Sequence, residues 1–267
     1  MIPTAIIDTL ELCFRSLGEL GASLTPDEWD RPTELPNWSV KDTLSHLVAI
    51  ERMLEGLPGT SHRAEHLDHV KNPIGELNEH EVDSRRSLPG TAVLAEWNEI
   101  TSRRLAALRS ANDDYFATPM MTPTGPGTLA DYLSIRVLDC WVHELDMRRA
   151  AGKPGHLSGP AAEHTIDRLL RTVPIVVGKR AATAEGESVA LTIDSPGVHR
   201  HVICEVRDGR ASFVDTPTAT PRCSISLGCE QFVMLATGRI GADDANAQVS
   251  GDAEHAARVL GQFNMMI

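Results

Sequence analysis

The segment at residues 128–151, TLADYLSIRVLDCWVHELDMRRAA, constrains the fold more than any other part of the chain. Its apolar residues recur at helical spacing, and no proline interrupts them. Thr128 followed by Asp131 resembles a capping box, which is typical of a helix start. Gly152 and then Pro154 give a stop signal. The pattern therefore predicts one long helix whose apolar stripe must be buried against other helices.

Asp139 and His143 stand four residues apart within this segment. Residues at that spacing lie on the same helix face, where a carboxylate and an imidazole can hold two positions of one metal ion. Asp146 can accept the other imidazole N–H and fix the tautomer. A solvated or hydrogen-bonded pair is the more frequent meaning of such spacing. Burial of the helix favours a metal, and a third ligand is then required.

His46 is the candidate for that third ligand. It lies in the middle of a second predicted helix, which begins at Asn37 and reads NWSVKDTLSHLVAIERMLEG. A lone histidine on an apolar helix is more often a core residue than a ligand, so the position alone leaves both readings open. The segment 61–71 adds His62, His66 and His69. We interpret it as solvated rather than as a second metal site, because nothing apolar shields it.

Four long helices are predicted in the first part of the chain, at residues 3–22, 37–56, 91–110 and 128–151. Residues 111–127 are rich in glycine and proline and are predicted to be a loop. Four such helices predict a four-helix bundle, and metal ligands commonly project from facing helices of a bundle.

The second part of the chain has a different pattern of predicted secondary structure. One helix is predicted at residues 159–177, with Pro174 expected to kink or end it. Short strands follow from residue 186, with Asp208-Gly209 as a hairpin turn. Asp252 is predicted to cap a final helix. We therefore expect a two-domain α+β protein, with a helix bundle at 1–155, a connecting helix at 156–185 and a small α+β domain at 186–267.

Composition limits the partners and the compartment. The net charge of −12 argues against nucleic acid or an anionic membrane as a partner. Five cysteines without framework spacing do not predict disulfides. Because neither a signal peptide nor an apolar span is recognisable, we expect a cytoplasmic protein. The sequence leaves monomer and homodimer both open.

Three stretches carry a resemblance to a known family: DCWVHELDMRRAAGKPG, SVKDTLSHLVAIE and NPIGELNEHEVDSRR. Together they resemble the mycothiol-dependent maleylpyruvate isomerase family, which belongs to the DinB-like metal-dependent bundles. The tail, from CEQFVMLATGR onward, is similar to a sterol-carrier-like domain. The resemblance implies zinc held by His46, Asp139 and His143. Asp139 stands where the isomerase has glutamate, and its shorter arm still suits zinc.

The resemblance also implies a function. Three protein ligands leave one zinc position open, and a thiol entering it loses its proton and becomes a nucleophile. Mycothiol is the implied thiol, and the implied activity is that of an isomerase or thiol S-transferase on a small electrophile. Cys140 is next to Asp139 but points about 100° away around the helix, so we interpret it as a packing residue.

Arg239, in the run ATGRIG, is the best match to a C-terminal arginine that the family's isomerase uses in catalysis. It would give an anionic substrate a bidentate partner. The alternative from another class is a non-catalytic metal-containing sensor or carrier whose tail binds an apolar ligand. Consumption of mycothiol with electrophiles, with and without a chelator, separates the two.

Overall fold

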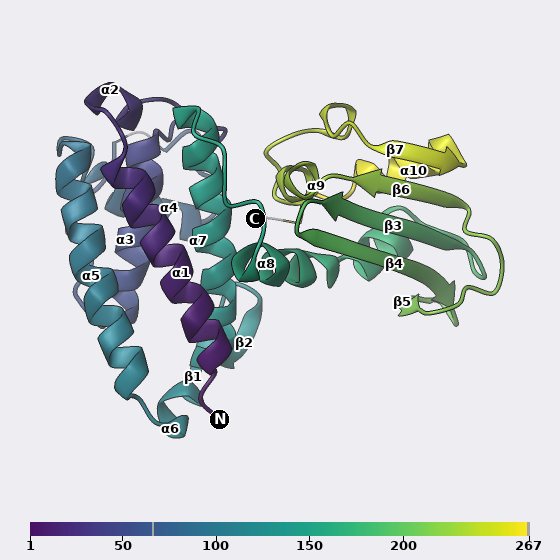
Figure 1. The fold of residues 1–267 in the computed structure, drawn as a ribbon, viewed down its shortest axis with the longest axis horizontal. Helices are drawn as coiled ribbons and strands as arrows, with labels where there is room; N and C mark the ends of the chain where they lie inside the picture. The colour runs from purple at the N-terminus through teal and green to yellow at the C-terminus, as the bar shows by residue number, and fades with distance from the viewer. Residues whose placement is uncertain (66, 266–267) are drawn as a thin grey trace. The chain divides into compact units, whose positions relative to one another are not determined.

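The computed structural model describes residues 1–65 and 67–265. The chain forms two compact units, Met1–Gly155 and His156–Ile267. The first unit is helical, and the second combines a sheet with helices (Figure 1). The predicted α+β class is therefore confirmed.

Four long helices form the body of the first unit. α1 packs against α5 and α7, and α3 packs against the same two helices, so the four make a bundle (Figure 1). This confirms the predicted four-helix bundle. The bundle helices are α1 (Thr4–Ala22), α3 (Val40–Leu54), α5 (Gly90–Ser110) and α7 (Leu129–Ala151). The shorter elements are α2 (Pro26–Trp29), α4 (Pro73–Asp83), α6 (Asp113–Phe116), β1 (Pro119–Thr122) and β2 (Gly125–Thr128).

The two helices that matter most for the site have defined ends. Thr128 and Asp131 form the predicted capping box of α7, and Gly152, with φ of 68°, ends it in the left-handed conformation. The helix predicted from Asn37 begins only at Val40. Asn37 itself has φ of 62°, which a helix cannot continue, and Ser39 caps α3 instead.

The loop predicted at residues 111–127 is wrong in part. It contains α6 and an antiparallel hairpin in which Pro119 pairs with Thr128 and Thr122 with Gly125. The Thr122 hydroxyl donates to the Gly125 carbonyl at 2.8 Å and closes the turn. Backbone pairing and one side-chain hydrogen bond make this hairpin, so its strands lack the apolar alternation that predicts a strand.

The second unit is built on a five-stranded sheet of order β5-β4-β3-β6-β7. β3 and β6 are parallel, and the other neighbours are antiparallel. The strands are β3 (Ser188–Ser195), β4 (Val198–Arg207), β5 (Arg210–Val214), β6 (Cys223–Leu227) and β7 (Gln248–Gly251). The helical elements are α8 (Pro160–Leu170), η1 (Ile175–Arg180), α9 (Cys229–Ala236), η2 (Ala242–Asp244) and α10 (Ala253–Leu260).

The helices of this unit cover the sheet. α9 contacts β3, α10 contacts β6, and η1 contacts β4 and β5. The Asp208-Gly209 turn and the Asp252 cap are confirmed. The helix predicted at 159–177 is shorter than expected, because α8 ends at Leu170. A π-helix begins directly after Pro174, the residue predicted to kink or end the helix. In the described part of the chain, no helix has the length and apolar character to cross a membrane.

Candidate metal centre

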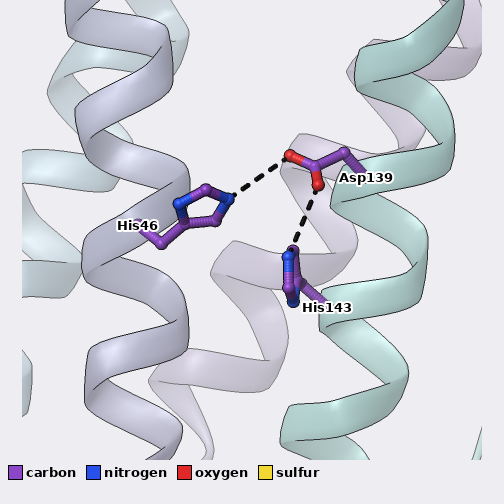
Figure 2. A group of neighbouring side chains, drawn as sticks. All are labelled: His46, Asp139 and His143. Carbon is purple, nitrogen blue, oxygen red and sulfur yellow. Dashed lines mark ion pairs between the residues drawn. The ribbon is translucent and has the colours of Figure 1, made fainter. Parts of the chain in front are cut away.

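Three side chains from two bundle helices converge on one point. His46 projects from α3 toward Asp139 and His143 on α7 (Figure 2). His46 Nε2 lies 3.7 Å from Asp139 Oδ2, and His143 Nε2 lies 3.4 Å from Asp139 Oδ1. Within the described residues, this is the one group of three or more possible ligands whose donor atoms all lie within 4.8 Å of one another.

The spacing of these atoms suits a tetrahedral metal ion. Ligand atoms bound at about 2.0–2.2 Å to tetrahedral zinc lie about 3.4 Å from one another, near both observed separations. The two imidazoles are buried, and the Asp139 side chain is 20% exposed. Imidazole nitrogen and carboxylate oxygen are ordinary zinc donors, so the residues present fit the ion that the sequence implies.

Asp146 lies where the sequence predicts it, behind His143. The Nδ1 of His143 and Oδ2 of Asp146 are 3.0 Å apart, and the Asp146 side chain is fully buried. Arg149 donates to the other Asp146 oxygen at 2.6 Å. Asp146 is therefore held as a carboxylate that fixes the ring of His143 and leaves its Nε2 facing Asp139.

Burial and charge set the protonation of the cluster. Burial lowers the pKa of His46, because the Asp139 carboxylate offsets the desolvation only in part. Burial opposes charge on His143 too, but hydrogen bonds to Asp139 and Asp146 outweigh it and raise the pKa of His143. For Asp139, burial would raise the pKa, yet the charge of Arg136 and the two histidines hold it well below its usual range. An ionised carboxylate and a neutral His46 are the forms that bind a metal.

Asp139 is also held by a network of buried charged side chains, which the spacing of residues in the sequence does not predict. Arg136, one turn earlier on α7, donates to Asp139 Oδ2 and also to Glu51 Oε1 at 2.8 Å. Glu51 in turn lies 3.5 Å from Arg104 on α5. All three of these network residues are almost fully buried. The sequence does show charged residues on apolar helix faces. It does not show that they pair, because the partners come from different helices.

Trp38 and Glu79 form a second support for the cluster. The Trp38 ring lies 5.3 Å from the His46 ring and 6.4 Å from the His143 ring, measured between centroids. Its indole N–H donates to Glu79 Oε2 at 2.8 Å, which fixes the ring. An aromatic wall therefore shields one side of both histidines from water.

The remaining predicted residues lie elsewhere. His62 pairs with Asp83 at 2.5 Å and His69 with Glu79 at 3.1 Å, while His66 lies outside the described residues. Both pairs are with carboxylates, as expected of ordinary ion pairs rather than a second cluster.

Cys140 and Arg239 were also singled out from the sequence. Cys140 is fully buried, its sulfur accepts from Arg136 at 3.4 Å, and burial raises its pKa well above the usual value. Such a thiol stays protonated and is a poor nucleophile. Arg239 follows α9 in the second unit and donates to the Thr237 carbonyl at 2.8 Å. Its catalytic role stays a prediction.

Fold and site together define a helical-bundle protein with a candidate metal centre, joined to an α+β unit. Residues 10–148, more than half of the chain, match the family described as the mycothiol maleylpyruvate isomerase N-terminal domain. The chain therefore belongs to that family. No curated protein sequence is significantly similar to it.

Two solved structures share the fold. The crystal structure of the mycothiol-dependent maleylpyruvate isomerase is 16% identical with a TM-score of 0.56, covering 92% of this chain and 91% of its own. The structure of a mutant of that isomerase matches with the same identity and TM-score over 91% of each chain. At this identity the likeness concerns the fold, and it extends over both units.

Proposed function

We propose that the protein is a metal-dependent enzyme that uses a low-molecular-weight thiol, mycothiol, on a small electrophile, as an isomerase or a thiol S-transferase. The observation that carries the proposal is the convergence of His46, Asp139 and His143 from two facing helices, at spacings near those of a tetrahedral ion. Family membership supports the thiol, because the related isomerase is described as mycothiol-dependent.

The three side chains would hold zinc through His46 Nε2, His143 Nε2 and one Asp139 oxygen. When bound, zinc with three protein ligands supplies an open position at which a thiol loses its proton and becomes nucleophilic. Asp146 keeps the proton of His143 on Nδ1 and so leaves Nε2 free to bind.

The surrounding side chains set the conditions at the cluster. Arg136 holds the second oxygen of Asp139 and keeps the carboxylate ionised. Trp38 excludes water from one side of the two rings. Because the Cys140 thiol beside Asp139 is buried and protonated, we assign the role of nucleophile to the external thiol.

Arg239 is proposed as the partner of an anionic group on the substrate, on the strength of the resemblance. A guanidinium binds a carboxylate through two parallel hydrogen bonds, which an ammonium cannot reproduce. Arg239→Lys is therefore expected to reduce turnover with metal content unchanged. Turnover equal to the wild type would remove Arg239 from the reaction.

The test of the proposal combines metal analysis with a thiol assay. Purified wild-type protein should contain one divalent metal per chain, and both His46→Ala and His143→Ala should lose it. Mycothiol should be consumed with electrophiles such as maleylpyruvate, and a chelator should stop the reaction. Metal retention in both variants would refute the site, and bound metal without thiol consumption would favour a non-catalytic sensor or carrier.

A further inference from the structure

The first unit carries an apolar groove beside the candidate metal centre. It has a volume of about 560 Å³ and is walled by α3, α4, α7 and the β1–β2 hairpin. Sites for small molecules commonly have volumes of about 300–1,000 Å³. The groove is therefore large enough for a ligand well beyond a single carboxylate.

Large apolar side chains stand open to solvent along this groove. Leu77 on α4 is 67% exposed and Met121 on β1 is 70% exposed, and Met53 and Ile74 beside them are more than half exposed. A cluster of exposed apolar side chains commonly marks a binding surface, and methionines adapt to ligands of different shape. These four residues come from three different elements, so helix amphipathicity alone does not account for their grouping.

The groove continues the face that carries the metal ligands. Ile50 follows His46 by four residues on α3, and Tyr132 precedes Asp139 by seven on α7. Both spacings keep residues on one face of a helix. The groove therefore lies on the same two helices as the cluster, about one turn from His46 and two turns from Asp139, and none of the three ligand residues lines it.

Tyr132 is one of several uncharged polar residues that line the groove, together with Asn78, Tyr115, Thr118 and Thr122. The residue is 8% exposed and lines the groove, and its hydroxyl has no hydrogen-bond partner among residues 1–65 and 67–265. The hydroxyl oxygen is not itself a buried atom without a partner, so it is open to the groove, where a ligand can accept a hydrogen bond from it. Burial raises the pKa of Tyr132, with Arg136 opposing and the Asp139 charge adding to the rise, so the hydroxyl stays a neutral donor.

The lining also limits the charge of the ligand. None of the side chains that form the groove is charged. A carboxylate placed there would lose its hydration without gaining a cation, which is costly. An uncharged hydrocarbon or aromatic body is the occupant that this wall favours.

We propose that the groove binds the apolar body of the electrophile, an α,β-unsaturated ketone or aldehyde with a hydrocarbon tail, and that Tyr132 donates a hydrogen bond to its carbonyl oxygen. This inference rests on the proposed function. In the reaction, the thiol sulfur bonds to the β-carbon, the C=C π bond breaks, and the thiol proton ends on the α-carbon. The carbonyl oxygen gains electron density during addition, where the Tyr132 hydroxyl would stabilise it.

The test uses the full-length, metal-loaded protein and two homologous series of probes. Saturated 2-alkanones from butanone to 2-nonanone measure binding by calorimetry, without thiol. The 2-alkenals from 2-butenal to 2-nonenal measure mycothiol consumption. Affinity and kcat/KM should each rise about fourfold per added methylene until the groove is filled, as expected for burial of a CH₂ group.

Variants locate the effect. Leu77→Glu puts a charge in the groove on an exposed side chain and should weaken 2-nonanone binding at least tenfold, with metal content unchanged. Val249→Glu, on β7 in the other unit and 39% exposed, is the matched control and should change nothing. Tyr132→Phe should weaken 2-nonanone binding about three- to tenfold, the size of one neutral hydrogen bond, and leave n-butylbenzene binding unchanged.

The outcomes separate the two proposals. A flat dependence on chain length, or Leu77→Glu binding equal to the wild type, would overturn the groove assignment while 2-butenal turnover upheld the proposed function. Ketone binding that is lost in Leu77→Glu, together with no thiol consumption for any electrophile, would uphold the groove and overturn the proposed function.

Discussion

Replacing Arg136 by methionine should destabilise the helical unit more than any surface substitution. Arg136 is 1% exposed and donates to Glu51 and Asp139. Among the residues that the structure describes, its loss leaves the fully buried Glu51 with only Arg104 as a charged partner, at 3.5 Å. Removing one partner of a buried ion pair costs about 3–5 kcal/mol. For a unit of 155 residues this corresponds to a Tm lower by about 6–20 °C, at about 2–4 °C per kcal/mol.

Tryptophan fluorescence isolates the relevant unit, because all four tryptophans of the chain lie in the first unit. Urea unfolding followed in this way therefore reports the bundle alone. Arg15→Met is the matched control, since Arg15 is a solvent-exposed arginine on α1 with a 3.8 Å ion pair to Glu19. Such surface pairs are worth at most about 1 kcal/mol.

A double-mutant cycle measures the coupling between Glu51 and Arg136. Glu51→Gln combined with Arg136→Met removes both buried charges, so the double variant should be more stable than the sum of the single effects by about 0.5–3 kcal/mol. Excess zinc should restore part of the Arg136→Met loss, because a cation beside Asp139 stabilises only the folded state. Additive single effects, or an Arg136→Met variant within 1 kcal/mol of Arg15→Met, would refute the assigned role.

Three further predictions test the surroundings of the site. Asp146→Asn should weaken zinc binding about 10- to 100-fold, measured by chelator competition; unchanged affinity would exclude Asp146. Burial alone would raise the pKa of Glu79, but hydrogen bonds from Trp38, His69 and Arg86 lower the pKa of this carboxyl below its usual value of 4.5. The unfolding free energy of the wild type should therefore exceed that of Glu79→Gln above that pH and converge with it in acid; a constant difference would contradict this. Cys140→Ala should keep full turnover and cost about 1 kcal/mol, whereas inactivity with metal and fold intact would make Cys140 the nucleophile.

Local signals were sufficient for the long helices of the bundle. The capping box at Thr128 and the left-handed Gly152 are properties of a few adjacent residues, so the bounds of α7 follow from the sequence. The i, i+4 spacing of Asp139 and His143 is local too. That His46 faces them across the bundle depends on how α3 packs against α7, and the sequence alone left it open.

Non-local pairing explains what the sequence did not reveal. Glu51, Arg104 and Arg136 come from three helices. In the sequence, each appears only as a charged residue on an apolar helix face, with no sign of its partner. The β1–β2 hairpin is held by backbone pairing, which leaves no apolar alternation to detect. In both cases the determining contact joins residues that no single-helix or single-strand period connects.

The same two helices carry both the ligand cluster and the apolar groove, one or two turns apart. Arg136 donates to Asp139, and Asp146 accepts from His143, so these two ligand residues are held by side chains that do not line the groove. Groove residues such as Ile50 and Leu77 make no part of these hydrogen bonds. Changes in the groove can therefore alter which hydrocarbon body binds without moving the ligand atoms. On this division, selectivity for the electrophile and affinity for the metal are separable properties, and variants of the two sets should act additively.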